Sequence, residues 1–81
     1  MTREDIIAKA KEILADEFEI DADLIVGEAP LKQTLGLDSL DLVDVVVLID
    51  QAFGVTLKGP DFAGIVSFDD FFNMLEKKIN A

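Results

Sequence analysis

Apolar residues near the N-terminus recur every three or four positions, with charged residues between them: Ile6, Ala10, Ile13, Leu14 and Phe18. This spacing is typical of an amphipathic helix. Thr2, followed three positions later by Asp5, resembles the side-chain cap that starts many helices. The pattern therefore predicts a helix over about residues 3–17.

The last part of the chain shows the same periodicity, in Phe68, Phe71, Phe72, Leu75 and Ile79. Ser67, with Asp70 three residues later, suits an N-cap. Lys77 and Lys78 come near the end, where cations favour the helix dipole. We predict that a final helix begins directly after Ser67.

Between these segments lies a long apolar stretch that starts at Ser39 or Leu40 and reaches about Phe53. Its many valines make a strand the rival interpretation, but the stretch is much longer than the usual strand of about 5–6 residues. Gly54 then suits a C-terminal cap. We therefore predict a helix here.

This middle helix has two apolar faces on a 3.6-residue wheel. One face is an ordinary core face: Leu42, Val45, Val46, Ile49, Ala52 and Phe53. Leu40, Val43 and Val47 project on the opposite side, among Asp41, Asp44, Gln51 and, at its edge, Asp50. Two interpretations stay open. Either this second face is an exposed contact site, or the preceding loop covers it.

That loop, residues 19–38, lacks sustained periodicity and is interrupted by Gly27 and Pro30. It still carries apolar residues, which we expect to be packed down: Ile20, Leu24, Ile25, Val26, Leu31, Leu35 and Leu37. A short helical turn is expected near Asp23 to Val26. A short third helix is predicted over Asp61 to Val66, after the break at Gly59 and Pro60.

The predicted fold is therefore all-α: a small four-helix bundle in a single domain, residues 1–81. It has three longer helices, a short third one, and a long loop between the first and second.

Composition excludes several functions. The 81 residues carry a net charge of −10 and include no cysteine and no histidine. A thiolate metal site and a Ser-His-Asp hydrolase are thus excluded. The acidic field repels nucleic acid and anionic lipid but attracts basic protein surfaces. With no signal peptide and no apolar run long enough to cross a membrane, we expect a cytoplasmic monomer without nucleic-acid or membrane partners.

No specific metal site is expected either. An EF-hand loop starting at Asp21 fails because Ile25, Val26 and Lys32 stand where an oxygen ligand, a glycine and a glutamate are required. The acidic clusters should bind Mg²⁺ or Ca²⁺ only weakly, by relieving their mutual repulsion.

Ser39 raises the question of chemistry. On its own, a serine before a helix is most often an N-cap. The stretch "LGLDSLDLVDVVVLIDQAFGV" is, however, similar to the core of the acyl carrier protein family. The shared positions are Leu35, Gly36, Asp38, Ser39 and Leu40, then Asp41, Val43, Asp44, Val46 and Phe53. The order of the predicted helices also agrees, so the resemblance covers the whole chain.

The resemblance implies a carrier and not an enzyme. Ser39 would bear a covalent phosphopantetheine arm that holds acyl groups as thioesters, and the chain would shuttle them between enzymes of fatty acid, lipid or polyketide-type biosynthesis. Asp38 would help to place Ser39 in the phosphopantetheinyl transferase. Basic patches on that transferase, and on acyl-loading, condensing, reducing or transferring enzymes, would dock on Leu40, Asp41, Val43, Asp44, Val47 and Asp50.

The family also places the acyl chain between the second and third helices. The lining positions implied here are Val46, Ile49, Phe53, Leu57, Phe62 and Ile65. Three departures from fatty-acid carriers, at Gln51, Ala52 and Phe62, indicate a specialised discrete carrier. Two alternatives remain: an unmodified acidic helical protein-interaction module, and a peptidyl or aminoacyl carrier, although the latter usually carries Gly-Gly-x-Ser.

Overall fold

The computed structural model describes residues 2–37 and 41–80. In order along the chain, these form α1 (Arg3–Phe18), η1 (Ala22–Leu24), α2 (Leu31–Leu35), α3 (Asp41–Phe53), η2 (Gly59–Phe62) and α4 (Phe68–Ile79), where η marks a 3₁₀ helix. The described residues form no strand; the sole β-type pairing among them is one isolated bridge between Pro30 and Ser67. The predicted all-α class is confirmed.

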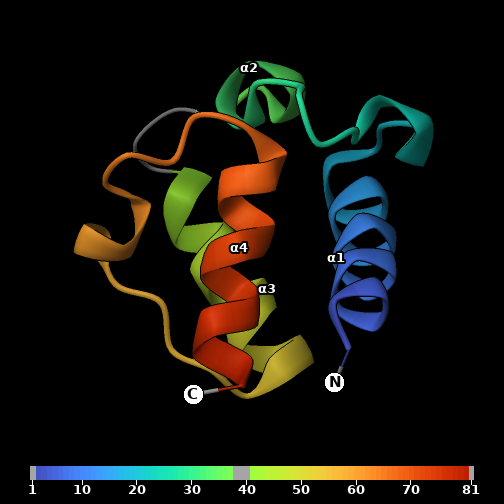
Figure 1. Cartoon of the computed structure of the whole chain (residues 1–81). Coiled ribbons are helices and arrows are strands. Elements are labelled where there is room, and N and C mark those ends of the chain that lie inside the picture. Colours follow the sequence, from blue (N-terminus) through green and yellow to red (C-terminus); the bar gives the residue numbers. More distant parts are fainter. Residues whose placement is uncertain (1, 38–40, 81) are drawn as a thin grey trace.

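Three longer helices surround the core, and α1 packs against both α3 and α4 (Figure 1). Helix α1 has the predicted cap, since Thr2 Oγ1 accepts from the Asp5 amide at 3.2 Å. Its residues Ile6, Ala10 and Leu14, spaced four apart, are completely buried. The 3.6-residue period therefore lays one stripe of α1 on the core.

Helix α4 supplies the aromatic part of the core. Its first turn is capped reciprocally: Ser67 Oγ accepts from the Asp70 amide at 3.4 Å, and Asp70 Oδ2 accepts from the Ser67 amide at 3.2 Å. Both predictions for this helix, its start and its cap, are confirmed. Phe68, Phe71, Phe72 and Leu75 are buried, with the Phe68 and Phe72 rings stacked at 6.1 Å.

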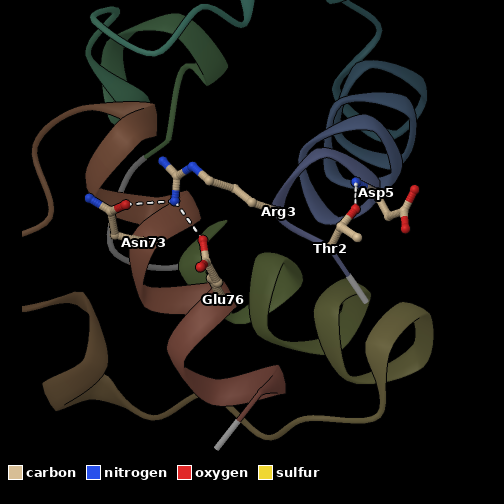
Figure 2. Close-up of polar contacts among 5 residues, drawn as sticks. All are labelled: Thr2, Arg3, Asp5, Asn73 and Glu76. Carbon is tan, nitrogen blue, oxygen red and sulfur yellow. Dashed lines mark hydrogen bonds and ion pairs between the residues drawn. The ribbon is translucent and has the colours of Figure 1, made fainter.

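A polar contact also joins α1 to α4. Arg3 Nη1 lies 2.9 Å from Glu76 Oε2 and 2.7 Å from Asn73 Oδ1, as Figure 2 shows. The first residue of α1 is thereby linked to the C-terminal half of α4.

The long loop is attached to the start of α4. The Phe68 amide donates to the Ala29 carbonyl at 3.1 Å, and the Asp69 amide donates to the Gly27 carbonyl at 2.9 Å. The Leu31 amide donates in turn to the Val66 carbonyl at 2.9 Å. Amides of the first helical turn lack partners within their own helix, so loop carbonyls satisfy two of them here.

The loops differ from the sequence predictions in three ways. Most apolar residues of the first loop are packed as expected, but Leu24 and Val26 are 54% and 41% exposed. The loop also contains α2, which we did not predict. The short third helix is not at 61–66; it is η2, at Gly59–Phe62. Proline suits the start of a helix because it fixes φ, and Gly64, at φ +79°, marks the turn that follows.

Candidate functional site

Helix α3 presents two different apolar faces. Val45 and Ile49 are completely buried, whereas Val43 is 60% and Val47 is 47% exposed. The loop before α3 therefore does not cover the two valines of the second face; its third apolar member, Leu40, lies outside the described residues. Of the two interpretations left open by the sequence, exposure is the one observed.

Carboxylates accompany these exposed valines. Asp44 and Asp50 are both exposed, and α3 contains no lysine or arginine. We call Val43, Asp44, Val47 and Asp50 the acidic–apolar face. Exposed apolar groups ringed by charge of one sign are suited to transient contact with a protein of opposite charge.

The C-terminal end of α3 is bound to α1 through one lysine. Lys9 Nζ donates to the Ala52 carbonyl at 2.7 Å and lies 5.3 Å from the centre of the Phe53 ring. A cation here complements the negative end of the helix dipole. Phe53 is half-buried beneath this contact, so its ring serves the packing of α1 on α3.

A small cleft opens between α3 and η2. It has a volume of about 220 Å³ and is lined by Leu42, Val43, Val46, Gly59 and Phe62. The lining is almost wholly apolar, and Val43 joins the cleft to the acidic–apolar face. We call it the α3–η2 cleft.

The residues proposed for an acyl pocket do not share one cavity. Val46 and Phe62 meet in the α3–η2 cleft. Ile49 and Leu57 belong to the closed core, at 0% and 3% exposure. Ile65 instead lines a different groove, between η2 and α4. Leu42, Val43 and Gly59 line the cleft but were not among the predicted lining residues; Val43 was predicted for the partner surface. Leu42, four positions before Val46, is marked by its helical spacing.

One aspartate anchors η2. Asp61 Oδ2 accepts from the Lys58 amide at 2.8 Å and from Lys78 Nζ at 2.9 Å. These two bonds lower the pKa of Asp61. The bond from Lys78 has the larger effect, and the bond from the Lys58 backbone has the next largest. The position of Phe62, the next residue, therefore depends on a contact with α4.

Asp38, Ser39 and Leu40, and the side chain of Asp41, lie outside the described residues. Gly36 ends α2 at φ +68°, a left-handed conformation that favours glycine. Among the described residues, its two chain neighbours apart, no atom lies within 4 Å of the position that a Cβ at Gly36 would occupy.

Two classes of site are absent from the described part of the chain. Within residues 2–37 and 41–80, no helix is long and apolar enough to span a membrane. Across the same residues, no group of three or more carboxylates is placed to hold a metal ion.

The sequence of this chain is similar to one protein family and to several known proteins. The family described as "Phosphopantetheine attachment site" matches residues 8–75. An acyl carrier protein of Thermotoga maritima is 37% identical over 78 residues, covering 96% of each chain. One from Petrotoga mobilis is 32% identical over 80 residues, covering 99% of this chain and 94% of the relative. One from Thermosynechococcus vestitus is 28% identical over 81 residues and covers both chains completely.

Proposed function

Because the chain belongs to the acyl carrier protein family, we propose that Ser39 bears its phosphopantetheine and that the chain shuttles acyl thioesters between biosynthetic enzymes. Members of this family are carriers and not catalysts, and their prosthetic group is covalently attached. The observation that carries the assignment is the position of Asp38-Ser39-Leu40, directly before the helix with the acidic–apolar face.

The residues present fit such a group. The family's attachment motif places the phosphodiester on a serine hydroxyl, and the two serines of the chain are Ser39 and Ser67; its other aliphatic hydroxyls belong to Thr2, Thr34 and Thr56. Ser67 is engaged in capping α4. When attached, the group supplies a thiol, which this cysteine-free chain otherwise lacks. The described residues leave open space beside Gly36 for an arm, and the apolar α3–η2 cleft has room for part of the chain that the arm carries.

The polypeptide's own part is recognition and shelter. We propose that Asp38 orients Ser39 in the phosphopantetheinyl transferase. The acidic–apolar face, extended by Leu40 and Asp41, would dock on basic patches of the transferase and of acyl-loading, condensing, reducing or transferring enzymes. The electrostatic attraction speeds encounter, and the exposed valines add contact area.

We further propose that the cargo is specialised and not that of general fatty acid synthesis. Gln51 and Ala52 dilute the acidic end of α3, and the Phe62 ring occupies one wall of a cleft of only about 220 Å³. Pockets for drug-sized ligands commonly measure about 300–1,000 Å³. If the enzymes of general fatty acid synthesis acted on this chain and on a housekeeping carrier at equal rates, the proposal would be contradicted.

Intact mass tests the attachment. The purified protein is incubated with coenzyme A, Mg²⁺ and a broad-specificity phosphopantetheinyl transferase. One phosphopantetheinyl group should be gained by the wild type and by Ser67→Ala, but not by Ser39→Ala. A folded wild type that gains no mass would favour an unmodified acidic interaction module. A preference of the holo protein for aminoacyl-loading enzymes would favour a peptidyl or aminoacyl carrier.

A further inference from the structure

A second hollow lies between η2 and α4, and it shares no lining residue with the α3–η2 cleft. We call it the η2–α4 groove. Its volume is about 520 Å³, within the usual range of small-molecule sites. Its apolar lining comes from Pro60, Ala63, Ile65 and Met74. Of these, Pro60 and Ala63 are exposed while Ile65 and Met74 are half-buried, so the groove is open to solvent with an apolar floor.

The charge at this groove is opposite to that of the chain. The protein has 17 acidic and 7 basic residues, yet the charged residues lining the groove are Lys77, Lys78 and Asp61. Lys78 Nζ lies 2.9 Å from Asp61 Oδ2, so these two charges offset each other. Lys77 is exposed at the rim. The groove therefore combines an apolar floor with a net positive edge.

We propose that the η2–α4 groove binds an aliphatic chain that ends in a carboxylate. The chain would lie along Pro60, Ile65 and Met74, and the carboxylate would pair with Lys77. Apolar burial supplies most of the attraction in such a site, while a correctly placed charge fixes the orientation of the ligand. A cationic or uncharged amphiphile of equal length lacks the second contact.

The two methionines make the test direct. Met74 lines the groove, so its methyl resonance reports on the groove floor, and the chain has one other methionine, Met1. Sodium octanoate is titrated into ¹³C-methyl-methionine-labelled apo protein, beside octanol and octyltrimethylammonium. Octanoate should move the Met74 signal saturably, and more strongly than either control. No saturable shift up to millimolar octanoate, or equal binding of all three compounds, would overturn the proposal.

Matched variants separate the charge from the cavity. Lys77→Gln should weaken octanoate about two- to fivefold, the range expected for an exposed ion pair, and leave octanol unaffected. Lys11→Gln makes the same charge change on α1 and should leave both unaffected. Ala63→Leu fills the groove and should weaken both compounds. If Lys77→Gln and Lys11→Gln changed the affinity for octanoate equally, Lys77 would not be the residue that recognises the carboxylate.

The carboxylate can come from a free fatty acid or from the far end of a dicarboxylic acyl group on the arm. The second source depends on the proposed function, so it is examined after mass spectrometry has verified loading. Transfer of a suberoyl-phosphopantetheinyl group is compared with transfer of an octanoyl one. A Met74 shift specific to the suberoyl form supports the arm as source. A shift with free octanoate alone supports an external one.

Discussion

Arg3, the first residue of α1, is paired with Glu76 near the end of α4, at 2.9 Å between Nη1 and Oε2 (Figure 2). Their side chains are 38% and 39% exposed, so solvent screens the pair. We expect Glu76→Gln to lower the free energy of unfolding by about 0.2–1 kcal/mol. Urea denaturation in a double-mutant cycle with Arg3→Gln measures the coupling. A coupling that persists unchanged in 1 M NaCl would contradict this account.

Two valines of α3 provide a matched test of its two faces. Val45→Ala removes buried methyl groups and should cost about 1–3 kcal/mol of stability. Val43→Ala, at an exposed position in the same helix, should change stability by less than about 0.5 kcal/mol. Because Val43 belongs to the acidic–apolar face, Val43→Ala should instead raise the KM of the phosphopantetheinyl transferase for this chain. Equal loss of stability in the two variants would show that both faces are packed.

Acid should weaken the anchors of η2 and α4. Hydrogen bonds lower the pKa of Asp61, chiefly the one from Lys78, and that of Asp70, chiefly the one from the Ser67 amide. A carboxyl whose pKa is lower in the folded than in the unfolded protein stabilises the folded state at pH values above the unfolded pKa. That contribution is lost as the pH falls through the folded value. The loss should therefore begin near pH 4 and increase below it.

Differences between variants isolate this effect from the repulsion among the other carboxylates. The stability gap between the wild type and Asp61→Asn, or Asp70→Asn, should be larger at pH 6 than at pH 3. Asp44→Asn makes an equal charge change on the exposed side of α3 and provides the control. A gap that grows toward low pH would reverse the predicted sign.

Docking should depend on charge at α3. Asp44→Asn and Asp50→Asn should each raise KM for the transferase about three- to tenfold at low ionic strength, because rim charges govern encounter. The effect should shrink as salt is added. Asp23→Asn, which removes an exposed carboxylate from η1, should have no comparable effect. If all three variants behave alike, net charge and not the acidic–apolar face is what partners recognise.

Divalent cations should stabilise the chain without occupying a built site. The net charge is −10, and among the described residues no group of three carboxylates is placed to hold a metal ion. We expect 10 mM Mg²⁺ or Ca²⁺ to raise Tm by roughly 2–8 °C, which corresponds to about 0.5–1 kcal/mol for a domain of this size. NaCl of equal ionic strength should raise it less. The absence of any shift would count against relief of repulsion.

Periodic segments were predictable from the sequence. The spacing of Ile6, Ala10 and Leu14 predicts α1, which ends one residue beyond the expected boundary. Ser67 and Asp70 predict the start of α4 because their capping bonds are local. Gly54, at φ +71°, ends α3 as expected. In each case, the signal lies within a few residues of the structure that it specifies.

Features that depend on distant contacts were not predictable. Helix α2 has only five residues, too few for a periodic signal, and contacts such as that of the Leu31 amide with the Val66 carbonyl hold it. A helical wheel places Val46 on one face of α3, but it does not show how η2 lies against that face. For the same reason, the sequence pattern did not show that Phe62 lines the α3–η2 cleft whereas Ile65 lines the η2–α4 groove.

The backbone bonds from Phe68 and Asp69 to the carbonyls of Ala29 and Gly27 couple two regions that would otherwise open independently. The first turn of a helix normally frays, and its amides exchange quickly with solvent. Here these two amides can exchange only when the loop lifts away from α4. Loop and helix start therefore form one cooperative unit of local unfolding. The free energy of lifting the loop away from α4 can be read from the exchange rates of these two helical amides.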